Sequence, residues 1–344
     1  MVDKNNNAWT KIGVWILVAV LAIGLAGCGN GSNGSDSNAG PSVTASASPS
    51  PSASPSAAPS ETSSAQESGP AQTTYPLALT DATGTEVSFE QAPERVVALA
   101  PSETEALFAI GAGSKIVGVD NYSDYPPEAK EIAKVGDMNT NTEALLAMKP
   151  DVVFAHASMQ AKVVEELRKL NVKVFASDPK TLEEVMAKIE TVGRIMDLQD
   201  GAKQATDTMR AELKQVTDAL QGVAPKRAYM EFSPGWTVGS GEYMDEILTL
   251  AGGDNVSKEK TGWFEVDPEA VIQANPEVIV YAHNSEFDLG IPTAIKERPG
   301  FDRIDAVKNN RMFPVDDNSI SRVGPRLTKV LRDMAKAIHP DKVK

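Results

Sequence analysis

One amphipathic stretch, from Asp200 to Gly222, lies between two halves of the chain that repeat the same local pattern. Its apolar residues recur at steps of three and four, which is the period of one helix face. They are Ala202, Ala205, Met209, Leu213, Val216, Leu220 and Val223. We predict a helix that Asp200 caps and that Gly222 and Pro225 end. At about 1.5 Å per residue it would be roughly 35 Å long, enough to join two lobes as a rigid spine.

Each half contains one glutamate followed, at the same spacing, by a proline, an apolar strand and a histidine. Glu143 lies seven residues before a proline, and an apolar strand and then His156 follow that proline. Glu269 has the same spacing to a proline, an apolar strand and His283. We interpret the halves as two lobes of similar build.

Short apolar strands alternate with helical patterns on both sides of the spine, which indicates parallel sheets covered by helices. The predicted strands are residues 95–99, 116–119, 151–155, 172–176, 227–232, 278–282 and 311–315, with a long loop after residue 282. Helix starts are predicted at two capping boxes, Ser102–Glu105 and Thr181–Glu184, and at Asp267. The fold class is therefore α/β, with two Rossmann-like lobes, residues 75–180 and 226–344, joined by connecting helices in residues 181–225.

The first 28 residues read as an export signal. Lys4 and Lys11 precede an apolar run, residues 12–26, which is shorter than the about 20 residues of a membrane-spanning helix. The run ends at Leu-Ala-Gly-Cys28, which resembles a bacterial lipobox, whose cysteine is lipidated and becomes the mature N-terminus. The alternative is an uncleaved anchor helix. Both interpretations place the protein on the outer face of the cell membrane.

Residues 29–74 are dominated by Gly, Ser, Asn, Ala and Pro. Such a segment has little to bury, so we predict a disordered linker. Its ends would be roughly 40 Å apart on average as a flexible coil. We interpret it as the tether between the lipid anchor and the folded lobes.

Composition and motifs limit the remaining possibilities. A net charge of −14 argues against nucleic acid as a partner. With one cysteine, no intramolecular disulfide can form. An enzyme acting between the lobes is a rival hypothesis, but the chain has no phosphate-binding loop, Gly-x-Ser-x-Gly, His-Glu-x-x-His or cysteine nucleophile. Three histidines are too few for a His-rich zinc or manganese receptor.

Four motifs carry a family resemblance. They are Gly118–Pro127, Glu143–Asp151, Trp263 with Glu269 six places later, and Ser321–Arg326. In this order they resemble the substrate-binding component of an ABC importer, of the two-lobe class with a rigid connecting helix that takes up vitamin B12, haem and iron–siderophore complexes. The likeness covers about Ala92 to Pro340 and is greatest to vitamin B12-binding proteins. It implies a monomer that delivers a corrinoid to a permease.

The resemblance also implies roles for particular residues. Tyr122, Trp263 and Arg322 would contact a ligand between the lobes, with Trp236 close behind. Each has a structural alternative: core packing for the tryptophans, a loop position for Tyr122 and a surface charge for Arg322.

Glu143 and Glu269 match the glutamates that meet arginines of the permease in this family. The alternative is that each stabilises a helix N-terminus by about 0.3–1 kcal/mol.

The chain departs from vitamin B12-binding proteins where they carry tryptophans on the first lobe. It has Asp137, Met138 and His156 there. The resemblance implies that the ligand is a metal-containing macrocycle (a corrinoid or haem) or a ferric siderophore. Since imidazole binds haem iron and cobalt, one of His156 and His283, with His156 the first candidate, is expected to contact the metal. A loop position is the ordinary interpretation of each histidine.

Overall fold

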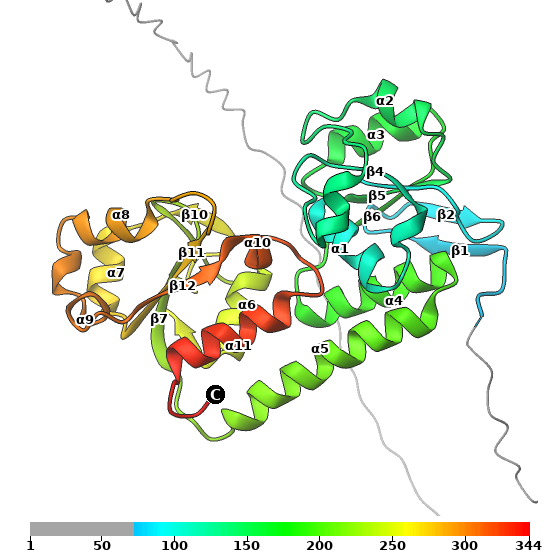
Figure 1. Ribbon diagram of the computed structural model, residues 1–344. Helices are drawn as coiled ribbons and strands as arrows, with labels where there is room; N and C mark the ends of the chain where they lie inside the picture. The colour runs from blue at the N-terminus through cyan, green and yellow to red at the C-terminus, as the bar shows by residue number, and fades with distance from the viewer. Residues whose placement is uncertain (1–71) are drawn as a thin grey trace, which may run out of the picture. The chain divides into compact units, whose positions relative to one another are not determined.

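The computed structural model describes residues 72–344, which belong to one compact unit built on two parallel sheets (Figure 1). The predicted signal peptide, Cys28 and most of the predicted linker lie outside the described residues. Within residues 72–344, no helix combines the length and apolar character that crossing a bilayer requires.

The N-terminal lobe is a four-stranded parallel sheet in the order β4-β3-β5-β6. Its elements are β3 (Val96–Ala98), α1 (Pro101–Ala109), η1 (Gly113–Lys115), β4 (Ile116–Val119), η2 (Pro127–Glu131), α2 (Thr142–Ala147), β5 (Val152–His156), α3 (Ala161–Lys169) and β6 (Val174–Ser177). An antiparallel hairpin that the sequence did not predict, β1 (Leu77–Thr80) and β2 (Glu86–Phe89), precedes them.

The C-terminal lobe has a second parallel sheet, in the order β12-β11-β7-β9. Its elements are β7 (Lys226–Glu231), β8 (Trp236–Val238), α6 (Tyr243–Leu250), β9 (Gly253–Asn255), β10 (Trp263–Glu265), α7 (Pro268–Ala274), β11 (Val278–His283), α8 (Ile291–Glu297), η3 (Phe301–Arg303), α9 (Asp305–Lys308), β12 (Met312–Asp316), α10 (Asp317–Ile320) and α11 (Leu327–Ile338). Strands β8 and β10 form a separate antiparallel ribbon.

The two sheets have the same topology when this ribbon is set aside. In each, the second strand along the chain lies at one edge, followed by the first, third and fourth. Helices α2 and α7 take the same place, between the second and third strands. The prediction of two similar α/β lobes is confirmed.

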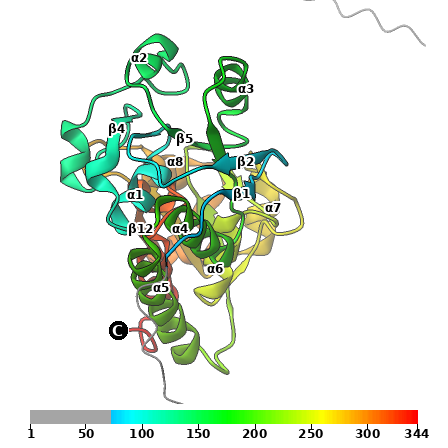
Figure 2. The same ribbon diagram turned by 90° about the vertical axis from the view of Figure 1, so that its right-hand side faces the viewer.

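Two helices connect the lobes, α4 (Leu182–Met196) and α5 (Gln199–Ala219). Both views place α4 beside α5 (Figures 1 and 2), and α5 also contacts α1 and α11. The predicted spine is therefore present, but the prediction that Asp200 caps it is wrong. Asp197 ends α4 in a left-handed conformation, so α5 begins immediately, with Leu198 at its N-cap and Asp200 inside the first turn.

Close approach of backbones fixes this corner. A Cβ atom on Gly201 of α5 would lie 2.2 Å from the Ile110 carbonyl oxygen at the end of α1. A Cβ atom on Gly193 of α4 would lie 2.4 Å from the Ala202 Cβ atom. Only glycine allows α1, α4 and α5 to pack this tightly.

Two other local predictions are wrong. Residues 102–105 do not form a capping box, because Pro101 takes the first helical position and Ala100 becomes the N-cap. The segment after β11 is not a long loop, since it contains α8, η3 and α9. In contrast, Thr181 and Asp267 cap α4 and α7 as predicted, each accepting a backbone N–H three residues later.

Side chains alternate between two cores on each sheet, as expected for parallel sheets covered on both faces. In the N-terminal lobe, Val96 and Ala98 face one cluster and Val97 faces another. In the C-terminal lobe, Val278 and Ile279 divide in the same way.

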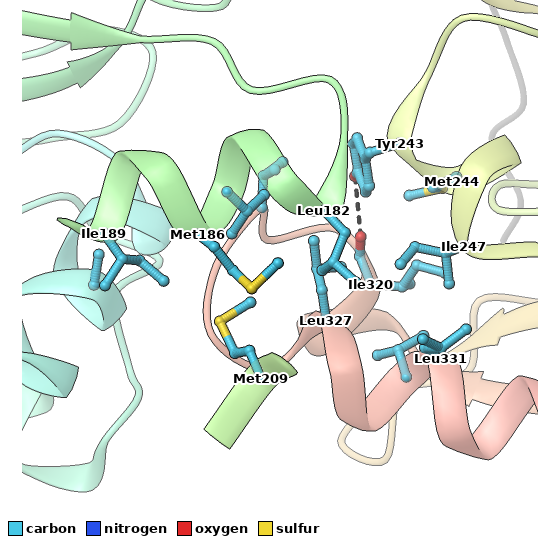
Figure 3. Close-up of a cluster of buried hydrophobic side chains, with 14 of the residues drawn as sticks. Leu182, Met186, Ile189, Met209, Tyr243, Met244, Ile247, Ile320, Leu327 and Leu331 are labelled. Atoms are coloured by element: carbon cyan, nitrogen blue, oxygen red, sulfur yellow. Dashed lines mark hydrogen bonds between the residues drawn. The ribbon is translucent and has the colours of Figure 1, made fainter. Parts of the chain in front are cut away.

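The largest buried cluster runs from one sheet to the other. It includes Val96 and Phe154 on one sheet and Met230 and Val280 on the other. Between them pack side chains of α4, α5, α6, α10 and α11 (Figure 3): Leu182, Met186, Ile189, Met209, Tyr243, Met244, Ile247, Ile320, Leu327 and Leu331. Because packed interiors resist deformation, this shared core holds the two lobes as one body.

Replacing Leu327 by alanine should lower the free energy of unfolding by about 2–5 kcal/mol, because this side chain is fully buried in the shared core. Denaturant unfolding followed by circular dichroism measures the change. Leu146→Ala, at an exposed position on α2, is the control and should cost less than about 1 kcal/mol. Equal, small losses in both variants would contradict the shared core.

Candidate functional site

Several exposed large apolar side chains follow the carboxyl ends of the sheet strands in the chain. Tyr122, Tyr125 and Met138 follow β4, Met159 follows β5, Trp236 follows β7, Trp263 follows β9 and Phe287 follows β11. Ligands of open parallel sheets bind at this end, and clustered apolar exposure marks interaction sites. The residues therefore outline one candidate site.

Contacts between the lobes bring these loops together. Arg322, in the segment between α10 and α11, reaches the Tyr122 carbonyl oxygen and the Asp124 carboxylate in the loop after β4. Lys180, which follows β6, lies 3.4 Å from the Glu242 carboxylate, which precedes α6. Loops at the carboxyl ends of both sheets thus meet at one seam.

The β8–β10 ribbon presents two tryptophans on the same face. Trp236 is paired with Glu265 and Trp263 with Val238, so the tryptophans are diagonal neighbours. The Trp263 ring packs edge-on against Phe232, with the ring centroids 4.6 Å apart. It still exposes 37% of its surface, and Trp236 exposes 40%. The ribbon therefore holds both tryptophans on one face, with part of each side chain exposed.

Tyr122 is the most exposed of these aromatic residues, at 65%. Its backbone is nevertheless held at both ends, because its N–H donates to the Asp120 carboxylate at 2.8 Å and its carbonyl accepts from Arg322 at 3.2 Å. The ring is thus presented by an anchored loop.

Arg322 is buried and has four hydrogen bonds within the protein. Its Nη1 donates to the Glu105 and Asp124 carboxylates at 3.1 and 2.6 Å, and its Nη2 donates to Tyr122 and Asn318 at 3.2 and 2.9 Å. Contact between Arg322 and a ligand stays a prediction. The structure adds a role between the lobes that the sequence did not indicate.

Glu105 and Arg326, which were not predicted as site residues, form a cluster with Arg322. Glu105 is 3% exposed, and Arg326 bonds both of its carboxylate oxygens, at 2.6 and 2.8 Å. Arg326 belongs to the Ser321–Arg326 motif. Its spacing of four residues from Arg322 was the signal in the sequence that the two side chains could share a partner. Nothing local marked Glu105, because its partners lie more than 200 residues away.

His156 is enclosed by its own lobe. It is 8% exposed, and its Nε2 lies 3.5 Å from the Asp178 carboxylate. Its Nδ1 faces the Met159 N–H at 3.5 Å. Its contact with a ligand metal stays a prediction. His283, at the end of β11, is exposed, and within residues 72–344 no group of three or more His, Cys, Asp or Glu side chains could hold a metal ion.

Glu143 and Glu269 have equivalent local settings. Each is the second residue of a short helix, α2 or α7, behind an Asn141 or Asp267 cap. Both are exposed, and neither forms an ion pair with another described residue. Figure 1 shows α2 and α7 on different lobes, each away from α5. The matched positions predicted from the sequence are present, whereas their docking role stays a prediction.

Burial lowers the pKa of the His156 imidazole below its ordinary value, although the Asp178 carboxylate opposes this shift. The unfolded chain therefore binds more protons than the folded protein below about pH 6.5, and stability falls as the pH falls from there toward the folded pKa. His156→Asn should remove this part of the pH dependence. Unfolding free energies measured between about pH 5 and pH 7.5 test it, and parallel curves for variant and wild type would contradict it.

Comparison with known proteins identifies the family to which this fold belongs. The profile of a family described as periplasmic binding protein matches residues 96–318. An uncharacterized ABC transporter substrate-binding lipoprotein, YvrC of Bacillus subtilis, is 30% identical over 344 residues, covering 97% of this chain and 99% of the relative.

Two further relatives have ligands in their names. The vitamin B12-binding protein of Yersinia pestis is 32% identical over 195 residues, which are 55% of this chain and 70% of the relative. The solved structure of the haem-binding protein RhuT from Roseiflexus has 25% identity and a TM-score of 0.65, covering 72% of this chain and 98% of that one. The chain therefore belongs to the periplasmic binding protein family and is a substrate-binding protein of an ABC importer rather than an enzyme.

Proposed function

We propose that this protein binds a corrinoid, a vitamin B12-like ligand, between its lobes and delivers it to an ABC permease. The observation that carries the proposal is the set of open aromatic rings at the meeting carboxyl ends, above all Trp236 and Trp263 on one face of the ribbon. Flat rings in fixed positions supply apolar contact with little loss of entropy. A broad macrocycle matches such a surface.

Charge separates the corrinoid from the alternatives, haem and a ferric siderophore. Haem carries two propionates, which call for a free cation, whereas the rim of a corrinoid carries mostly neutral amides. Arg322 and Arg326 are both bound to the Glu105 carboxylate. Glu265, the last residue of β10, and Glu286, in the segment after β11, have no ion-pair partner among the described residues. Because both arginines of the seam are already bound to Glu105, neither is a free cation for a propionate, which favours the neutral amides of a corrinoid at this place.

Titration of the apo-protein with cyanocobalamin, and separately with haemin, tests the ligand. We expect cyanocobalamin to bind, with Trp263→Ala weakening its affinity at least about tenfold, or about 1.4 kcal/mol. Leu170→Ala, at an exposed apolar position after α3, is the control and should bind like the wild type. Visible spectra and calorimetry report binding. Haemin binding without cyanocobalamin binding would contradict the corrinoid proposal and support the haem alternative.

We also propose that Glu143 and Glu269 dock the protein on the permease, since they are exposed acids at matched places on the two lobes. Exposed charges of this kind give orientation and association rate. Lipidation at Cys28, with the linker as a tether, would keep a monomer near the permease on the outer face of the membrane.

The double substitution Glu143→Lys and Glu269→Lys should abolish uptake in cells while the affinity for ligand in solution stays unchanged. The matched control is Glu131→Lys with Glu297→Lys, one exposed acid on each lobe outside α2 and α7. Uptake of labelled cyanocobalamin and calorimetry measure the two quantities. Normal uptake by the first pair, or lost ligand binding by a folded protein, would overturn the docking role.

A further inference from the structure

We propose that Glu105, Arg322 and Arg326 form an interlobe latch that positions the loop 120–127, and with it the Tyr122 and Tyr125 side chains, at the candidate site. Arg322 and Arg326 are then positioning residues that act on the ligand through that loop. The effect on ligand affinity rests on the proposed function, whereas the effect on the loop does not.

The centre of the latch is a buried carboxylate shared by two guanidinium groups. Arg326 approaches Glu105 with Nε on one oxygen and Nη2 on the other, and Arg322 adds Nη1. The Glu105 side chain is 2% exposed. Bidentate, charge-assisted bonds are strong and directional, and removal of one partner from a buried pair is costly. The geometry therefore fixes both arginines relative to α1 of the other lobe.

The same two arginines reach the loop 120–127. Arg322 bonds the Asp124 carboxylate at 2.6 Å and the Tyr122 carbonyl oxygen at 3.2 Å. The Arg326 guanidinium lies 4.3 Å from the centre of the Tyr125 ring, a cation–π distance. The C-terminal lobe thus holds three successive parts of a loop that belongs to the N-terminal lobe.

The N-terminal lobe holds the beginning of this loop by other bonds. The Ser123 hydroxyl lies 2.7 Å from the Thr104 hydroxyl, and Lys134 donates to the Ser123 carbonyl oxygen at 2.6 Å. Asp124 and Tyr125 instead meet Arg322 and Arg326 from across the seam. Loss of the arginine contacts should therefore loosen the loop without unfolding the lobe.

A second buried pair keeps the seam closed when the latch is altered. Lys188 of α4 bonds the Glu103 carboxylate at 3.0 Å and the Val323 carbonyl oxygen at 2.9 Å. With the shared apolar core, this pair holds α1 near the segment that carries Arg322. Conservative changes in the latch should consequently act on the loop alone.

Hydrogen exchange of the apo-protein tests the latch directly. Arg322→Lys keeps the charge but cannot make four bonds in a planar fork, so amides in the loop 120–127 should exchange at least about tenfold faster, a change of about 1.4 kcal/mol in local opening. Amides of β5 should keep their protection. Arg168→Gln, which removes an ion pair with Asp81 inside the N-terminal lobe, is the control and should leave the loop unchanged.

Asp124→Asn is the second variant. The Asp124 side chain is 37% exposed, and the substitution removes its charge while Glu105, Arg322 and Arg326 stay in the protein. We expect faster exchange of the loop together with weaker binding of cyanocobalamin. Weaker binding by Arg322→Lys with unchanged loop exchange would make Arg322 a direct ligand contact and overturn the latch. Faster exchange in both variants with unchanged affinity would overturn the positioning role. If the wild type does not bind cyanocobalamin, the ligand proposal fails, and the exchange result still decides the latch.

Discussion

The structure depends on one apolar core that belongs to both lobes. Side chains from each sheet and from α4, α5, α6 and α11 form a single cluster, so neither lobe encloses its inner face alone (Figure 3). Packing at crystal-like density gives such a cluster few alternative arrangements. The relative placement of the lobes is thus a property of the core, and α5 is stiff because its apolar face is part of it.

Buried ion pairs at the seam add specific geometry to the placement of the lobes that the apolar core determines. Glu103 and Glu105 of α1 face Lys188, Arg322 and Arg326. Buried ion pairs add little net stability because desolvation offsets their attraction, but their geometry is specific. Here Arg322 and Arg326 hold a loop, whereas the Lys188–Glu103 pair holds α1 near the segment that carries Arg322. A site that is formed before the ligand arrives loses less entropy on binding, which suits a substrate-binding protein.

The sequence predicted what local patterns can encode. The strand cores, the paired placement of Glu143 and Glu269, and the caps Thr181 and Asp267 were all predictable, because each depends on neighbours within a few residues. The spine was also predictable, although its start was not, since the turn after Asp197 is set by α4.

Features that depend on distant partners were not predictable. The β8–β10 ribbon pairs strands of three residues each, too short to give a period. The helices after β11 are likewise short. Their apolar residues are buried in a cluster with Tyr229 and Ile279, which come from other parts of the lobe. Three of the four hydrogen-bond partners of Arg322, namely Glu105, Tyr122 and Asp124, lie on the other lobe. Tyr122, Trp236 and Trp263 were expected at the site from the resemblance, whereas the exposure of Tyr125, Met159 and Phe287 after the sheet strands depends on the fold.

The distance between the lobes, measured by electron spin resonance with and without ligand, tests whether the shared core holds the two lobes in one arrangement. Spin labels at Lys162 of α3 and Lys296 of α8, both exposed, can be placed in a chain whose single cysteine, Cys28, has been replaced. A shared core predicts one narrow distance distribution that ligand leaves nearly unchanged. A broad distribution in the apo-protein, or a large closing movement on binding, would contradict it.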